Sequence, residues 1–158
     1  MLIGRQDSKI DEKNRISFPK KFRKIIGNRL IVTQGFEGSL IVISQDQFDI
    51  LLEGTKGKPI IDKKAREVER FLLGSAEEVE LDEKGRFILP EYLKGYANLS
   101  SEVTCLGLNK YVQIWDKKRW EEHNLDLIKK IEPITEKLSN DPSTSVRQAQ
   151  DKGSGQGK

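Results

Sequence analysis

The sequence predicts an α+β protein made of two copies of one supersecondary unit, closed against each other into a β-barrel pseudo-dimer with peripheral helices. Two observations support this prediction. The segment DEKNRISFPKKF, residues 11–22, returns as DEKGRFILPEYL, residues 82–93, at a constant offset of 71 positions. In both copies, short runs rich in β-branched residues alternate with turn residues and with helix-forming segments. A chain of 158 residues is long enough for such a fused pair.

Each predicted copy opens with a tight turn between two strands. The first turn has the sequence DEKNR and the second DEKGR. Asp11 and Asp82 take the first position, where an Asp side chain bonds the backbone two residues further on. Asn14 and Gly85 are residue types that tolerate a positive φ. These four residues are therefore the predicted turn formers.

The strand after each turn stops at a proline, where the chain changes from strand to helix. Pro19 and Pro90 suit the first position of a helix and not the interior of a sheet. A further pair of strands, rich in β-branched residues, follows within residues 30–43 and 102–115. Strands with unpaired edges favour closure of one copy on the other, which is why we expect a barrel.

Helices are predicted outside the strands. The capping box S-Q-D-Q starts one at Ser44, Asp62 caps a second that joins the copies, and a longer amphipathic helix follows Asp116. From residue 139 the sequence is polar and rich in Gly and Ser, which is typical of a disordered tail. The predicted organisation is a first repeat at 1–60, a linking helix at 61–75, a second repeat with the C-terminal helix at 76–138, and the tail at 139–158.

Composition disfavours several classes of function. The chain has one cysteine, Cys105, and one histidine, His123, which are too few for a disulfide or a zinc site. The adjacent acids of the turns point apart and have no nucleophile or phosphate loop beside them, so an enzyme is not expected. No apolar run is long enough to span a bilayer. We therefore expect a cytoplasmic protein without cofactor, metal, membrane or small-molecule substrate.

Positive charge is concentrated in the first copy. The net charge of the chain is only +3. Residues 1–29 hold nine Lys/Arg against three Asp/Glu, a net charge of +6, whereas the matching residues 72–100 hold three against six, a net charge of −3. Neutralisation of phosphates by Lys and Arg supplies most non-specific affinity for DNA. The hypothesis is that copy one carries a DNA-binding face.

The strongest candidates stand just after the turns. Arg15 and Arg86 can each present a planar guanidinium to a guanine edge or a phosphate. The structural alternative is an ion pair across the turn with Asp11 or Asp82, and for the cations of residues 20–24 it is a solvated helix face. The candidate DNA-binding residues are Arg5, Lys9, Lys13, Arg15, Lys20, Lys21, Arg23, Lys24, Lys84 and Arg86.

The doubled D-x-x-G-R-x-x-x-P pattern resembles the MraZ family of bacterial transcriptional regulators. Here it reads DEKNRISFP and DEKGRFILP, with RFLLGSAEEVELDEKGR between the halves, and the resemblance covers residues 1–136. It implies a duplicated AbrB-like swapped-hairpin fold. It also implies a nucleoid-associated homo-oligomeric ring that binds double-stranded promoter DNA upstream of the division and cell-wall gene cluster, including its own promoter. Asn14 departs from the pattern, which has glycine there.

A ring built by head-to-tail contacts presents its reading elements in one sense, so it favours direct repeats about one helical turn apart. Two alternatives stay open. One is a protein-binding assembly module, for which we expect no footprint on promoter DNA. The other is an antitoxin-like regulator, against which the fused duplication argues.

Overall fold

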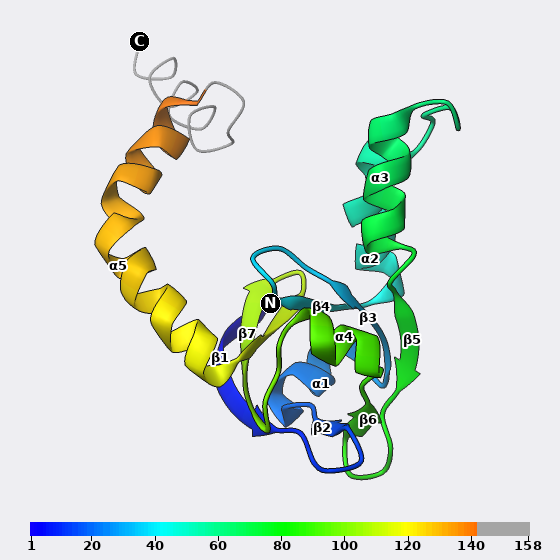
Figure 1. Cartoon of the computed structure of the whole chain (residues 1–158), viewed down its shortest axis with the longest axis vertical. Coiled ribbons are helices and arrows are strands. Elements are labelled where there is room, and N and C mark those ends of the chain that lie inside the picture. Colours follow the sequence, from blue (N-terminus) through cyan, green and yellow to red (C-terminus); the bar gives the residue numbers. More distant parts are fainter. Residues whose placement is uncertain (142–158) are drawn as a thin grey trace. The chain divides into compact units, whose positions relative to one another are not determined.

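The computed structural model of the chain describes residues 1–141 (Figure 1). The chain divides into two compact units, of which the first is Met1–Trp120 and the second begins at Glu121. In chain order the elements are β1 (Leu2–Lys9), β2 (Arg15–Ser17), α1 (Lys20–Ile26), β3 (Arg29–Gln34), β4 (Leu40–Ile43), α2 (Gln45–Leu51), the 3-10 helix η1 (Leu52–Thr55), α3 (Lys63–Leu72), β5 (Glu77–Glu80), β6 (Arg86–Ile88), α4 (Glu91–Tyr96), β7 (Glu102–Asn109), β8 (Val112–Asp116) and α5 (Lys117–Asn140). The predicted α+β class is confirmed.

The two copies exchange strands. The six-stranded antiparallel sheet has the order β1-β7-β8-β4-β3-β5. In it, β1 of copy one pairs with β7 of copy two, from Leu2↔Asn109 to Lys9↔Glu102. Reciprocally, β5 of copy two pairs with β3 of copy one, from Arg29↔Glu80 to Val32↔Glu77. Neither copy is therefore a separate sheet.

The predicted closed barrel is wrong, because the large sheet is open. Its edge strands, β1 and β5, do not pair with each other within residues 1–141. After each edge strand the chain turns away into a strand of only three residues, β2 or β6. These short strands pair with each other in a separate two-stranded sheet, which we call the β2–β6 ribbon. These two short strands thus belong to the ribbon and not to the large sheet.

The main core is shared by equivalent residues of both copies. Three pairs separated by the repeat offset are buried in it: Ile16 and Phe87, Phe18 and Leu89, and Phe22 and Leu93. The last pair comes from α1 and α4, which Figure 1 shows near the centre of the first unit. Full burial of each such side chain contributes roughly 1.5–3 kcal/mol. Because both copies supply this core, one copy alone would expose much of it.

A second cluster holds α2, η1 and α3 against β3 and β4, with Ile31, Ile43, Phe48, Leu52 and Leu72 buried. The sequence-based helix starts are confirmed here. The Ser44 side chain accepts a hydrogen bond from the Gln47 backbone N–H at 3.3 Å, and Asp62 accepts one from Ala65 at 3.1 Å.

The predicted C-terminal helix is α5, which begins directly after Asp116 and has Pro133 inside it. Within residues 1–141, no helix is both long and apolar enough to cross a membrane. Ser139 and Asn140 of the predicted tail belong to α5, and residues 142–158 lie outside the described part. The predicted domain boundaries stay a prediction.

Candidate nucleic-acid interface

The two turns have the same hydrogen-bond pattern. In turn one (residues 11–15), the Asp11 Oδ1 atom accepts hydrogen bonds from the backbone N–H groups of Lys13 and Arg15, both at 2.9 Å. In turn two (residues 82–86), Asp82 does the same for residues 84 and 86, also at 2.9 Å. Asn14 and Gly85 have φ values of 60° and 75°, the conformation that these residue types tolerate. The sequence chemistry of each turn thus accounts for its shape.

Each aspartate also holds the arginine that ends its turn. Arg15 Nε donates to Asp11 Oδ2 at 2.7 Å, and Arg86 Nε donates to Asp82 Oδ2 at 3.0 Å. The arginine side chains remain 32% and 23% exposed. The ion pairs use only the Nε edge, so the Nη1 and Nη2 groups of both guanidinium groups have no hydrogen-bond partner in residues 1–141. The ion pair and an outward binding function are therefore compatible.

The aspartates stay charged well into acidic solution. The hydrogen bond from the Arg15 backbone N–H, together with that from its side chain, lowers the pKa of Asp11 below its ordinary value of 3.8. The same contacts from Arg86 lower the pKa of Asp82. Both carboxylates are thus ionised at neutral pH and fix the orientation of the guanidinium groups.

The β2–β6 ribbon places both arginines on one face. Its central pair, Ile16↔Phe87, is buried, with exposures of 0% and 2%. Because side chains alternate along a strand, the neighbours of this pair project to the opposite, outward side. The register Arg15↔Ile88 and Ser17↔Arg86 therefore puts one arginine at each end of the outward face. Both line one shallow hollow of about 290 Å³.

The remaining candidate cations differ in their surroundings. Lys13 and Lys84, the matching third residues of the turns, are exposed and make no ion pair within residues 1–141. Lys9, at the end of β1, is exposed and lies opposite Glu102. Arg5 lies in the middle of β1, where its Nε is 3.4 Å from the Asp7 carboxylate. Lys13 and Lys84 are thus exposed within the turns, whereas Arg5 lies in β1 away from turn one.

The cations of α1 lie on two sides of the helix. The Lys21 Nζ atom lies over Gly4 of β1 and 5.9 Å from the centre of the Phe22 ring. Arg23 extends instead toward turn two, where its guanidinium lies against Gly85. Lys20 and Lys24 are exposed.

Sequence reasoning missed two residues of α4 that contact turn one. The Asn14 side chain donates from Nδ2 to Glu91 Oε1 and accepts at Oδ1 from Lys94 Nζ at 2.9 Å. Lys94 is the repeat equivalent of Arg23, as Gly85 is of Asn14. The two copies therefore differ at both partners of this contact, Asn14 with Lys94 in one case and Gly85 with Arg23 in the other, and this paired difference is visible when the repeats are aligned.

Metal and thiol chemistry have no support in the described part of the chain. Residues 1–141 contain no group of three or more His, Cys, Asp or Glu side chains arranged to hold a metal ion. Cys105 is buried, and burial raises the pKa of its thiol to about 12. It is therefore an unreactive core residue.

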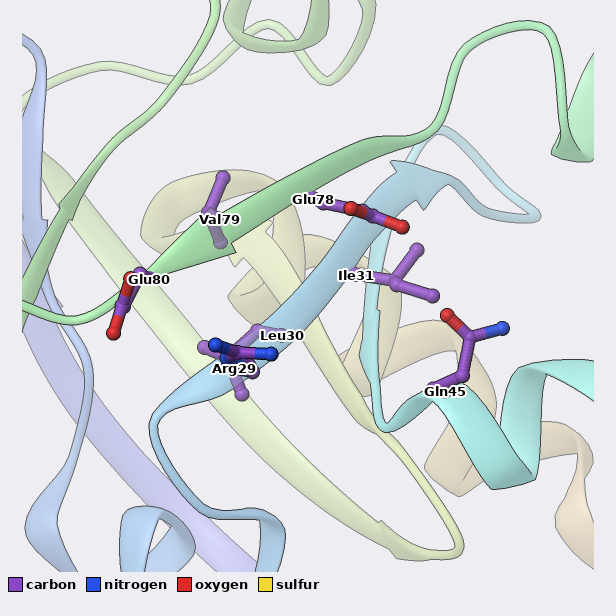
Figure 2. A pocket seen from close by; sticks show the side chains of 7 residues that line it. All are labelled: Arg29, Leu30, Ile31, Gln45, Glu78, Val79 and Glu80. Atoms are coloured by element: carbon purple, nitrogen blue, oxygen red, sulfur yellow. The ribbon is translucent and has the colours of Figure 1, made fainter.

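A second surface feature lies at the β5 edge of the sheet. Figure 2 shows a hollow between β5 and β3 on one side and the start of α2 on the other, with a volume of about 420 Å³. It is lined by Arg29, Leu30, Ile31, Gln45, Glu78, Val79 and Glu80. A neighbouring hollow shares Ile31, Gln45 and Glu78 and extends to Phe48 and Leu73. Together they form a partly apolar groove, along which lie the acidic residues Asp49, Glu78 and Glu80 and the cation Arg29, and which we call the β5 groove.

Comparison with known proteins decides the family. The model of a family described as "MraZ protein, putative antitoxin-like" matches the chain twice, over residues 1–71 and 72–140. The chain belongs to the MraZ family. The two matches confirm the duplication, with one family domain in each half.

Curated relatives in the MraZ family resemble nearly the whole chain. Proteins named "Transcriptional regulator MraZ" from Clostridium tetani and Clostridium beijerinckii are 36% and 37% identical over 139 and 140 residues. These alignments cover 88% and 89% of this chain and 97% and 98% of the relatives. A third relative of that name, from Caldanaerobacter subterraneus, is 36% identical over 140 residues. Because the family is one of transcriptional regulators, the prediction that the chain is not an enzyme is confirmed.

Proposed function

We propose that this protein is a DNA-binding transcriptional regulator that contacts duplex DNA with the outward face of the β2–β6 ribbon. The observation that carries the proposal is the shared outward position of Arg15 and Arg86, each held by an aspartate through Nε with both Nη groups left for a ligand. A two-stranded ribbon fits the major groove, and the Nη edge of an arginine can bond guanine or phosphate oxygens in pairs. The names of the curated relatives support this role.

The other cations take the positioning role. Lys13 and Lys84 flank the arginines in the turns and are free of ion pairs within the described residues. Lysine contacts with phosphates fix the register of a protein on DNA without reading sequence. We assign the same role to Lys9, Lys20, Lys21, Arg23 and Lys24, while Arg5 contributes to the general field of the basic N-terminal segment.

The exchange of β1 and β5 between the copies supports an AbrB-like swapped-hairpin fold as the architecture of this DNA-binding unit. We infer from the family resemblance that the target lies upstream of the division and cell-wall gene cluster and includes the promoter of the protein itself.

Assembly of several copies would let such a unit recognise direct repeats. The β5 groove offers an apolar floor with acidic Glu78 and Glu80. At the tip between α2 and α3, Ile60 and Ile61 are 88% and 84% exposed. Four lysines flank them in sequence: Lys56, Lys58, Lys63 and Lys64. We propose that the tip of one copy docks in the β5 groove of the next, because the two surfaces are complementary in charge and apolarity.

Such contacts are head-to-tail, and we propose that the rotation between successive copies closes them into a ring. The double variant Glu78→Lys with Glu80→Lys should dissociate the assembly, as measured by analytical ultracentrifugation. Addition of Lys63→Glu and Lys64→Glu to this variant should restore the assembly. Failure of the combined variant to reassociate would contradict this pairing of surfaces but not the DNA-binding proposal.

DNA binding is tested by titrating the protein with the duplex that lies immediately upstream of its own gene, across a salt series. Each neutralised phosphate contributes a slope of about −0.9 to the plot of log affinity against log salt concentration. A slope of several units is expected. A slope near zero would remove the phosphate-contact account.

The family description "antitoxin-like" favours one second candidate, a regulator whose main partner is another protein. Nuclease footprinting on the same duplex separates the two. Protection of direct repeats supports the DNA-binding proposal, and the absence of any footprint supports the second candidate.

A further inference from the structure

The helix of copy one lies beside the turn of copy two. The Phe18 backbone N–H donates to the Gly85 carbonyl at 2.9 Å, and α1 begins two residues later, directly after Pro19. The Arg23 guanidinium lies so close to Gly85 that a Cβ atom there would collide with its Nη1 and Cζ atoms. Turn two of copy two is therefore adjacent to the basic helix α1 of copy one.

Turn one has the equivalent arrangement with the helix of copy two. The Leu89 backbone N–H donates to the Asn14 carbonyl at 2.8 Å, and α4 begins directly after Pro90. Lys94 and Glu91 of α4 both bond the Asn14 side chain. Each turn is thus flanked by the helix of the other copy.

The turns themselves do not differ in charge, since each contains one Asp, one Glu, one Lys and one Arg. The flanking helices do differ. The α1 positions Lys20, Arg23 and Lys24 share a helical face and carry three positive charges. Their repeat equivalents on α4 are Glu91, Lys94 and Gly95, with a net charge of zero. The helix positions therefore differ by three charges in favour of turn two, whereas the strand residues just before the turns, Glu80 and Lys9, differ in the opposite sense.

The charge on α1 is available to an anion. Within residues 1–141, no carboxylate forms an ion pair with Lys20, Arg23 or Lys24. The Arg23 Nε atom is buried and has no hydrogen-bond partner among the described residues. At turn one, in contrast, Lys94 is bonded to Asn14, and the Glu91 carboxylate would repel a phosphate.

We propose that turn two and α1 form a composite phosphate-binding site built from both copies, and that this end of the β2–β6 ribbon holds DNA more strongly than turn one with α4. The inference rests on the proposed DNA-binding function and identifies the residues that contribute most to the affinity for DNA. The sequence-based hypothesis combined the cations of copy one with the turn of copy one. In the structure, however, Arg23 and the start of its helix α1 lie beside the turn of copy two.

The matched variants Lys84→Ala and Lys13→Ala test the proposal. Both side chains are exposed and hold equivalent positions in identical turn sequences, so both variants should fold like the parent protein. Affinity for the duplex upstream of the protein's own gene is measured for each variant across a salt series. Lys84→Ala should reduce the magnitude of the salt slope by about 0.9 for each bound protomer and weaken binding roughly five- to tenfold at 0.1 M salt. Lys13→Ala should weaken binding less, by about two- to threefold, because turn one lies beside the uncharged set of α4 positions.

A second pair of variants tests whether the helices cause the difference in DNA affinity between the two turns. Lys20→Ala should weaken binding like Lys84→Ala, whereas Glu91→Ala should leave affinity unchanged or increase it. Equal losses for Lys13→Ala and Lys84→Ala, or a larger loss for Lys13→Ala, would overturn the composite site. Failure of the parent protein to show salt-dependent binding would overturn the proposed function instead, so the two failures are distinguishable.

Discussion

The Lys94 Nζ atom lies 2.9 Å from Oδ1 of Asn14, so a helix of the second copy supports a turn of the first. This contact explains why turn one tolerates an asparagine where the repeat has glycine. Asn14 adopts a φ of 60° and uses its side chain to bond α4. At turn two the partner is the larger Arg23, and Gly85 leaves room for it.

Gly85→Asn should disturb turn two although the same residue stands in turn one. Asparagine tolerates the positive φ of 75°, but its Cβ atom would displace the Arg23 guanidinium. We expect a loss of about 1 kcal/mol in the free energy of unfolding, measured by urea titration, and weaker binding to the duplex.

The matched control converts turn two fully into the arrangement of turn one. Gly85→Asn combined with Arg23→Lys recreates the Asn–Lys pair, so it should be more stable than Gly85→Asn alone. If the combined variant is no more stable than the sum of the two single changes predicts, the contact between residues 23 and 85 is not the cause of the stability lost in Gly85→Asn.

Asp82→Asn should lower DNA affinity although it removes a negative charge from a DNA-binding face. The variant loses the ionic bond from Arg86 Nε, which is 3.0 Å long in the structure. Because a freely rotating guanidinium loses more conformational entropy on binding, we expect DNA affinity to fall roughly threefold to tenfold. Fluorescence anisotropy with labelled duplex measures it. Tighter binding would mean that charge outweighs orientation at this position.

Stability should fall as the solution is acidified through the pKa values of Asp11 and Asp82. Hydrogen bonds from Arg15 and Arg86 lower these pKa values below 3.8 in the folded protein, so the unfolded chain binds protons more tightly. The stabilisation is therefore complete above the ordinary value and is lost as pH falls through the lowered values. Thermal unfolding measured between pH 7 and pH 2 should show this loss.

The double variant Asp11→Asn with Asp82→Asn is the control for the acid effect. It should be less stable at neutral pH and should lose less stability on acidification. Some acid dependence should remain from Asp7 and Asp116, where burial acts to raise the pKa but hydrogen bonds and nearby cations together lower it below the ordinary value. An unchanged acid profile in the double variant would exclude the turns as its source.

The shared core predicts that both copies unfold together. Phe22→Ala and Leu93→Ala remove equivalent, fully buried side chains of α1 and α4 and should each cost about 2–5 kcal/mol. The fluorescence of Trp115 and Trp120 and far-UV circular dichroism should give coincident transitions over the first unit. Two separated transitions, with each variant shifting only one, would show that the copies are independent.

Short-range chemistry was predictable from the sequence, and relations between the copies were not. The Asp and Asn/Gly positions predicted the turns, and Ser44 and Asp62 predicted helix starts, because each effect acts within a few residues. The pairing of β1 with β7 joins residues about a hundred positions apart, so no local pattern predicts it. The same holds for the open sheet and for the contact of Arg23 with turn two. The sequence-based hypothesis joined the cations of residues 20–24 with turn one because it treated each copy as its own unit, whereas Arg23 lies against Gly85 of turn two.

The central claim is that Arg15 and Arg86 present DNA-binding groups on one face of the β2–β6 ribbon. Its most direct test is the affinity of the double variant Arg15→Ala with Arg86→Ala for the duplex upstream of the protein's own gene. The control is Arg70→Ala with Lys129→Ala, which removes the same charge from exposed positions outside the ribbon. The ribbon variant should lose at least about thirtyfold in affinity, since each guanidinium contact is worth roughly 1–3 kcal/mol, and the control should stay within about twofold. Equal losses in the two double variants would contradict the claim.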